Sequence, residues 1–253
     1  MPNPAWAFDI PAMSILKPGD MIVPFGTTSW TAETMRLEAL ADGGWEHDCP
    51  VGYVVVGEGR GHRLSGTTHN LPVPTHLAPD DHAGMVTFLK NRARGLCDIF
   101  NKRQAAFVAH YFTFINDHLA DNAAEMDEMA AEFHGLYSPE HWLFAAFAPL
   151  PQAHIFVGGV GAERFVLAPL AIWTDAGGIA VYFASAETAG GRTASDQARL
   201  RDAVVHVLEL DEADHATPHS LAAALPESVK HYWRSQPLPI GPFAAEVAEV
   251  LPS

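Results

Sequence analysis

Cysteine and positive charge are both scarce in this chain of 253 residues. Cys49 and Cys97 are its only cysteines, so the sequence can build neither a disulfide framework nor a cysteine-rich zinc module. Only 15 Lys and Arg residues stand against 30 Asp and Glu, which gives a formal net charge of -15. An acidic surface repels phosphate backbones and anionic lipids, so we expect no nucleic-acid partner.

Long apolar runs and a leader-like start are also missing. No uninterrupted apolar run approaches the ~20 residues that a membrane-spanning helix needs, and residues 1–9 combine no basic segment with an apolar one. We therefore expect no membrane partner and a cytoplasmic location, which suits a chain without disulfides. Apolar residues make up 48% of the chain and aromatic ones 10%, so the sequence predicts a folded protein with a substantial core.

The apolar pattern predicts an α+β fold in two regions, residues 1–135 and 136–253. The first region is expected to be β-rich, because short apolar runs such as Met21–Val23 and Val51–Val56 alternate with turn signals, with one helix around Thr31–Leu40. It ends in one long helix, or two with a break near Gly95, because apolar residues recur there at three- and four-residue steps. This apolar stripe comprises Val86, Leu89, Ala93, Leu96, Phe100, Phe107, Tyr111, Ile115, Leu119, Ala123, Met126, Ala130 and Phe133.

The second region is predicted to be an α/β unit with a three- to four-stranded sheet. Its expected order is a short helix after Ser138, three strands, a helix opened by Thr193, and a strand over Val204–Leu210. Short helices should follow at Thr217-Pro218 and Gly241-Pro242. The three successive strands are Ala153–Val157, Phe165–Trp173 and Ile179–Ala184.

Two of these strands should be central and buried on both faces, because Phe165–Trp173 and Ile179–Ala184 are near-continuous apolar runs. Pro169 cannot donate a ladder hydrogen bond, so we expect a bulge or an edge segment there. A buried phenol needs a hydrogen-bond partner, which predicts one for the Tyr182 hydroxyl.

Cys97 is the first candidate for chemistry. Basic residues surround it, and a helix that starts after Gly95 would also favour the thiolate, the form that attacks carbonyls. The alternative is an inert core thiol, because Cys97 lies on the same apolar stripe as Leu89, Ala93, Leu96 and Phe100, and free cysteines are commonly buried. The basic neighbours are Lys90, Arg92, Arg94, Lys102 and Arg103.

A motif upstream gives Cys97 a possible role. Leu16-Lys17-Pro18-Gly19-Asp20, which leads into Met21–Val23, resembles the opening of the circularly permuted papain-like hydrolases of the NlpC/P60 superfamily. The resemblance covers residues 14–105 and implies a short helix at Ser29–Arg36, a strand at Val51–Val56 and a helix that carries the nucleophile Cys97. It implies His47 as general base, three residues before Pro50. The resulting hypothesis is a cysteine hydrolase or acyltransferase that acts on an amide, thioester or ester.

Two further groups could hold a metal, and each has a plainer interpretation. The histidine-rich stretch lacks an HxH or HxxxH pair, so exposed loop histidines explain it. The acidic helix face lacks a Glu-x-x-His pair, so a solvated face explains it. The stretch comprises His47, Asp48, Cys49, His62, His69, His76, Asp80, Asp81 and His82, and the face comprises His110, Asp117, His118, Asp121, Glu125, Glu128, Glu132 and His134. No cofactor motif is present, so none is expected.

The element order over residues 139–210 resembles the core of the PD-(D/E)xK nuclease superfamily. That site needs an acid on the second core strand and an acid-x-Lys on the third, whereas Val166–Trp173 and Ile179–Ala184 contain neither. The nearest acids are Glu163, Asp175 and Glu187. The alternative function is therefore a non-catalytic subunit or adaptor that binds a protein partner or self-associates.

Overall fold

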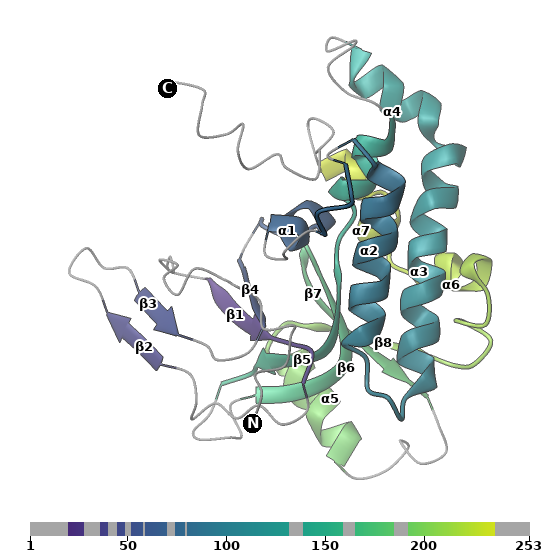
Figure 1. Cartoon of the computed structure of the whole chain (residues 1–253). Coiled ribbons are helices and arrows are strands. Elements are labelled where there is room, and N and C mark those ends of the chain that lie inside the picture. The colour runs from purple at the N-terminus through teal and green to yellow at the C-terminus, as the bar shows by residue number, and fades with distance from the viewer. Residues whose placement is uncertain are drawn as a thin grey trace.

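The computed structural model has an α+β architecture (Figure 1). A four-stranded mixed sheet lies at the centre, with helices on one face and a two-stranded sheet and one helix on the other. This confirms the predicted fold class. The structure describes residues 20–27, 36–39, 45–48, 52–57, 59–69, 74–78, 80–131, 139–158, 165–184 and 192–235.

The central sheet consists of β5 (Pro149–Phe156), β6 (Phe165–Thr174), β7 (Gly177–Phe183) and β8 (His206–Leu210), in that spatial order. β5, β6 and β7 pair antiparallel, and β8 pairs parallel to β7 after a crossover through α5 (Arg192–Asp202). The predicted order of three strands, helix and strand is therefore confirmed. β6 and β7 are the inner strands and are mostly buried, as their apolar runs predicted.

Pro169 limits the pairing of β6. The ladder between β6 and β7 runs from Thr174↔Gly177 to Leu170↔Val181 and stops before Pro169. The ladder with β5 skips Gln152 and Pro169 without a change of register, so no residue is inserted. Because proline has no N–H, the first half of β6 is an edge segment on the β7 side, which is one of the two predicted alternatives.

Tyr182 corrects one expectation. Its hydroxyl is buried and has no hydrogen-bond partner among the described residues. The ring belongs to an apolar cluster with Leu200 and Val205. Burial raises the pKa of Tyr182, and the charge of Asp196 raises it further.

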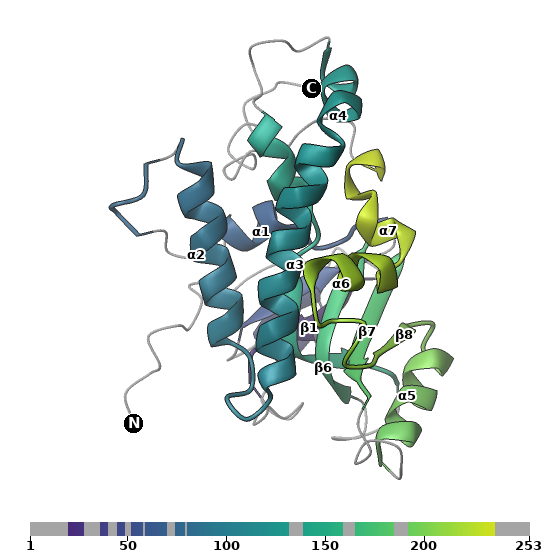
Figure 2. The ribbon, with the colours of Figure 1, turned by 90° about the vertical axis from the view of Figure 1, so that its right-hand side faces the viewer.

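The predicted long helical segment is divided into α2 (His82–Gly95), α3 (Lys102–Asp121) and α4 (Ala123–Met129). The break at Gly95 is confirmed. Asp81 caps α2 by accepting a hydrogen bond from the Gly84 amide. Figure 2 shows α2, α3 and α6 (Pro218–Ala224) side by side over one face of the sheet.

The described strands of the N-terminal region form two separate pairs. β1 (Met21–Pro24) pairs with β4 (Tyr53–Val56), and β2 (Arg36–Ala39) pairs with β3 (Trp45–Asp48), both antiparallel. The helix predicted around Thr31–Leu40 is therefore wrong for residues 36–39, because cross-strand pairing with β3 overrides local helix propensity. Residues 28–35, which would complete that helix, lie outside the described part.

The described helices after residue 138 begin at or near the positions that the sequence predicted. η3 (Pro139–Ala145) is the short helix expected after Ser138, and Pro226 separates α6 from α7 (Glu227–Lys230). The chain continues into η5 (Tyr232–Ser235), whereas the helix expected at Gly241-Pro242 lies outside the described residues.

Two apolar clusters hold the layers together. The larger lies between the sheet and α2, α3, η3, α6 and η5, and its members come from both sides of the expected boundary at residue 136. The smaller lies on the opposite face, where β1, β4 and α5 cover the sheet. Alternating residues of β7 supply both clusters: Val181 enters the larger and Tyr182 the smaller. Among the described helices, none is both long and apolar enough to cross a bilayer.

Candidate functional site

The connection between α2 and α3, which we term the α2–α3 turn (residues 96–101), presents two large apolar side chains to solvent. Ile99 is 85% exposed and Phe100 is 88% exposed. Immediately before them, Leu96 and Cys97 are buried, each in a different apolar cluster. The turn is therefore anchored in the core at one end and carries its apolar residues outward at the other.

Hydrogen bonds fix the shape of the turn. The carboxylate of Asp98 accepts a hydrogen bond from the Phe100 amide at 2.9 Å, and the Asp98 carbonyl accepts one from the Asn101 amide at 2.9 Å. The buried Gln104 side chain accepts a bond from the Asp98 amide at 2.9 Å. Asn101 also caps α3. A turn with this many internal bonds holds Ile99 and Phe100 in defined positions.

Gln152 of β5 links the central sheet to the α2–α3 turn. The Gln152 side-chain amide donates to the Leu96 carbonyl at 2.9 Å. Gln152 has a φ of 51°, a left-handed conformation that residues other than Gly adopt only at an energetic cost. This strained residue in the sheet is therefore tied to the backbone from which the turn departs.

Positive charge surrounds the exposed pair. Arg94 lies in the last turn of α2, and Lys102 and Arg103 begin α3, whose first turn contains no acidic residue. Cations at a helix N-terminus oppose the helix dipole and cost a few tenths of a kcal/mol or more each. Between Lys90 and Arg103, Asp98 is the single carboxylate, and it is engaged in the turn. Cationic residues thus flank the apolar tip, Ile99 and Phe100, on both sides along the chain, and we term them the cationic collar; the chain as a whole has a net charge of -15.

Sequence periodicity placed Phe100 on the buried stripe, and this prediction is wrong. α2 ends at Gly95 and α3 begins at Lys102, so the helical repeat that would carry the stripe through Phe100 is interrupted. Two polar residues beside Phe100 could have indicated a turn with outward-facing residues. They are Asp98 and Asn101, the N-cap three residues before Gln104.

Cys97 lies in the core. The residue is 7% exposed, and its thiol donates to the Ala93 carbonyl at 3.4 Å. Burial raises the pKa of the Cys97 thiol to about 12, against a smaller lowering effect of Arg94. The helix start expected after Gly95 is wrong, because Gly95 ends α2 and Cys97 follows a helix C-terminus, where the dipole disfavours a thiolate. These features favour the inert core thiol.

His47, the other residue of the hydrolase hypothesis, lies in β3. Its side chain is outside the described part of the structure, as is Cys49. The approach of His47 to Cys97 therefore stays a prediction. Of the short helix that the resemblance implies at Ser29–Arg36, only Arg36 is described, and it lies in β2.

The remaining sequence candidates whose side chains the structure describes do not assemble into a metal centre. Among the described residues, no group of three or more His, Cys, Asp or Glu side chains could hold a metal ion. His62 is buried beside the Thr67 hydroxyl, with 2.9 Å between Nε2 and Oγ1. On the acidic helix face, Asp117, Asp121 and Glu128 are exposed, as predicted for a solvated face. His118 departs from that pattern because it packs against Trp233.

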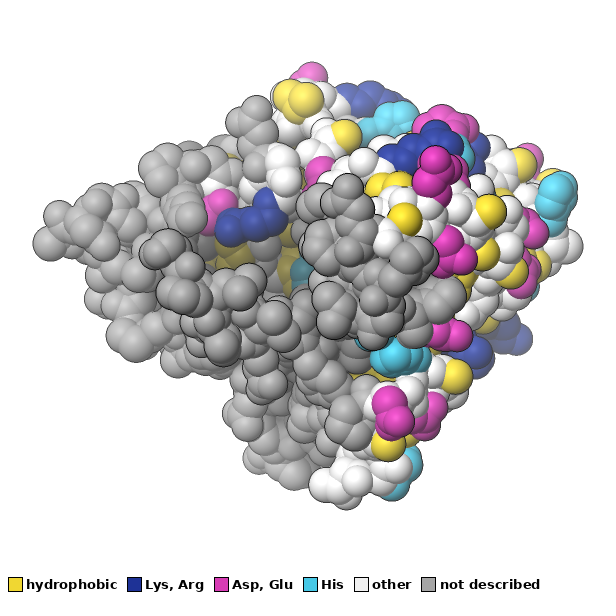
Figure 3. All heavy atoms as spheres, turned by 90° about the horizontal axis from the view of Figure 1, so that it is seen from above, with side chains coloured by type: hydrophobic (Ala, Val, Ile, Leu, Met, Phe, Trp, Pro, Cys, Tyr) yellow, Lys and Arg dark blue, Asp and Glu magenta, His cyan; other side chains and the backbone are white. Residues whose placement is uncertain are grey.

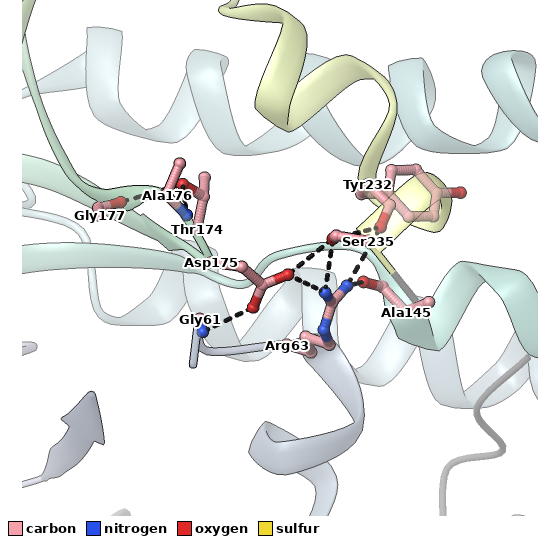
Figure 4. Close-up of polar contacts among 9 residues, drawn as sticks. All are labelled: Gly61, Arg63, Ala145, Thr174, Asp175, Ala176, Gly177, Tyr232 and Ser235. Atoms are coloured by element: carbon pink, nitrogen blue, oxygen red, sulfur yellow. Dashed lines mark hydrogen bonds and ion pairs between the residues drawn. The ribbon is translucent and has the colours of Figure 1, made fainter. Parts of the chain in front are cut away.

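A polar junction joins distant parts of the chain at the turn between β6 and β7 (Figure 4). Asp175 accepts hydrogen bonds from the Gly61 amide at 2.8 Å and the Ser235 hydroxyl at 2.6 Å, and it forms an ion pair with Arg63. Arg63 also donates to the carbonyls of Ala145 and Tyr232. Both carboxylate oxygens of Asp175 are thus occupied, so this acid serves as a structural tie rather than as a free metal ligand.

No family model, curated protein or solved structure matches this chain in comparisons of its sequence and fold. The geometry of the chain itself therefore carries the functional argument.

Proposed function

We propose that this protein is a non-catalytic subunit or adaptor that binds a protein partner through the α2–α3 turn. The observation that carries the proposal is the exposure of Ile99 and Phe100, at 85% and 88%, on a turn that hydrogen bonds hold in one shape. Covering a Phe or Ile side chain contributes on the order of 1.5–3 kcal/mol, which makes the pair suitable as an interface anchor.

The rigidity of the turn adds to this argument. Ordering a flexible loop at an interface costs conformational entropy, which reduces affinity. Here the internal bonds of Asp98 and Asn101, with the support of Gln152, have already fixed the backbone. Burial of Ile99 and Phe100 at an interface can therefore stabilise a complex without a large loss of conformational entropy.

The collar indicates the chemistry of the partner. Arg94 and Lys102 are exposed beside the tip, so a partner with an apolar pocket rimmed by carboxylates fits both features. A nucleic acid would match the cations but not the apolar pair. An anionic membrane would match both, but the net charge of -15 opposes its approach.

Affinity purification from the native cells tests the proposal with matched variants. We expect the wild-type protein to retain a discrete partner that the double variant I99S/F100S loses at least tenfold. L167S, which changes a residue 38% exposed on the sheet, should retain it. Equal recovery with all three proteins would contradict the proposal. Sedimentation of wild type, but not I99S/F100S, with anionic phospholipid vesicles would instead assign the tip to a membrane.

A further inference from the structure

Two buried glutamines hold the backbone of the α2–α3 turn through separate hydrogen bonds. Gln104, in the first turn of α3, accepts a bond at Oε1 from the Asp98 amide at 2.9 Å. Gln152, in β5, donates from Nε2 to the Leu96 carbonyl at 2.9 Å. Burial of an amide costs free energy unless it is hydrogen-bonded, so the turn accounts for the burial of both side chains.

The backbone of Gln152 suits glycine better than glutamine. Its φ of 51° is unfavourable for a residue with a Cβ, whereas glycine adopts it readily. The ladder between β5 and β6 omits Gln152 and Pro169, so pairing within the sheet does not explain why glutamine occupies this position. What glutamine adds is its side-chain bond to the Leu96 carbonyl.

The side chain of Leu96 fixes the same end of the turn. It packs in the smaller apolar cluster, and Gly26 makes room for it, because a Cβ added to Gly26 would lie 2.8 Å from Cδ2 of Leu96. The Gly26 amide also donates to the Pro151 carbonyl at 2.8 Å, which fixes β5 next to Gln152. The start of the turn is therefore anchored by its side chain and by its carbonyl.

Gln104 acts on the apolar tip through Asp98. It holds the Asp98 amide, and Asp98 in turn accepts bonds from the Phe100 and Asn101 amides, each at 2.9 Å. A chain of hydrogen bonds thus runs from a buried side chain to the backbone of the tip. Loss of the Gln104 bond would free the Asp98 amide, and Ile99 and Phe100 would then sample several positions.

We propose that Gln104 and Gln152 are positioning residues, which order the α2–α3 turn so that Ile99 and Phe100 meet a partner in one arrangement. The inference rests on the proposed function, because it assigns the two bonds to binding. An anchor that is already ordered loses less conformational entropy at an interface, so affinity depends on residues that do not touch the partner. Strained backbone is concentrated at functional sites, which accounts for glutamine at position 152.

The far end of α3 has a different surface. Figure 3 shows the molecule from the side of α4, opposite to the α2–α3 turn in Figure 1. The described apolar side chains on this face appear as small spots among acidic, basic and histidine side chains. The two glutamines are therefore bonded to the end of the molecule that carries the exposed apolar pair.

Amide hydrogen exchange of the full chain, measured residue by residue, tests the Gln104 bond without a partner. Q104M keeps the length of the side chain but has no acceptor, so the amides of Asp98, Phe100 and Asn101 should exchange about tenfold faster. Q104E retains an acceptor oxygen in either protonation state and should exchange within about threefold of the wild type. This rescue separates the hydrogen bond from the volume of the buried side chain.

Q152G separates the order of the turn from the stability of the fold. It removes both the bond to Leu96 and the left-handed strain, so the thermal midpoint should stay within about 3 °C of the wild type. The amides of Asp98 and Phe100 should nevertheless exchange about tenfold faster. Q152M removes the bond alone and should lower the midpoint as well. Wild-type exchange in Q104M and Q152G, or exchange in Q104E as fast as in Q104M, would overturn the proposal.

Affinity purification from the native cells connects order to binding. Q104M and Q152G leave Ile99 and Phe100 in place, yet they should retain the partner of the wild type about fivefold less well, whereas Q104E should retain it. Full retention by Q104M and Q152G despite faster exchange would overturn the positioning role alone. A wild-type protein that retains no discrete partner would instead contradict the proposed function, and with it the assignment of the two bonds to binding.

Discussion

Cys97 illustrates how position decides the chemistry of a residue. Its neighbours are cationic, yet burial dominates and raises the thiol pKa to about 12. We expect iodoacetamide to label Cys97 in the native protein much more slowly than in urea, because only the thiolate reacts. A C49S background leaves Cys97 as the single thiol. Rapid native labelling at pH 7 would restore the hydrolase hypothesis, and the same assay in H47Q would then test the general base.

Ile99 and Phe100 are predicted to be dispensable for folding. Because both side chains face solvent, I99S/F100S should change the free energy of unfolding by no more than about 0.5 kcal/mol. F107A removes a fully buried ring of α3 and should cost about 3–5 kcal/mol. Urea unfolding measures both. A large loss in the double variant would show that the pair has a structural role rather than an interface role.

His62 makes stability depend on pH. Burial lowers its pKa from 6.5 to about 4, so the unfolded chain binds the proton first as the pH falls. The stability is therefore complete above about pH 6.5 and falls by roughly 3 kcal/mol as the pH drops to 4. Urea unfolding between pH 8 and pH 4 should show a shallower dependence for H62Q than for the wild type. His154, whose pKa is also lowered by burial, leaves some dependence in H62Q. Equal slopes would contradict the assignment.

At the scale of the element, the turn that follows α5 contains a strained residue. Val204 has a φ of 61° and is 88% exposed, and the Val205 amide donates to the Leu200 carbonyl to close the helix. Glycine suits this left-handed position, whereas a β-branched residue is strained there. We expect V204G to stabilise the protein by about 0.5–1 kcal/mol, the strain relief exceeding the entropy cost of glycine.

V204A is the matched control for that change. It removes the β-branch but retains Cβ, so its gain should be smaller than that of V204G. Thermal and urea unfolding of the three proteins measure the difference. A V204G variant no more stable than V204A would show that the left-handed backbone carries no relievable strain.

Helices and strands could be predicted where the apolar pattern and the Gly, Pro or capping residues indicate the same boundaries. The three antiparallel strands, the α5 crossover and the break at Gly95 all follow from apolar runs bounded by Gly, Pro or capping residues. The strand at residues 36–39 could not be predicted, because it depends on pairing with β3. A local sequence pattern does not contain that pairing.

The candidate site escaped prediction for a related reason. Phe100 falls at a stripe position when residues are counted, but the hydrogen-bonded helix had already ended at Gly95. The packing of His118 against Trp233 joins residues more than a hundred positions apart, so only the packed structure brings them together. In contrast, the cationic segment around Cys97 was visible in the sequence, and the structure changes its interpretation from activating a thiol to surrounding an apolar tip.

At the scale of the whole molecule, the basic residues are unevenly distributed along the chain. The chain is acidic overall, and the stretch from Gln104 to Glu163 contains no Lys or Arg. Cations are concentrated beside the α2–α3 turn, where two highly exposed apolar side chains, Ile99 and Phe100, also lie. This asymmetry gives the molecule one end suited to a partner surface that combines acidic and apolar side chains.

Site-specific photo-crosslinking in the native cells tests this account most directly. Phe100 is replaced by p-benzoylphenylalanine in one protein and Val204, equally exposed at 88%, in another. We predict that irradiation links position 100 to one discrete protein partner, that added salt weakens the link through the cationic collar, and that position 204 yields no such product. The absence of a discrete product from position 100, or the same product from both positions, would contradict the assignment of the α2–α3 turn as a protein-binding site.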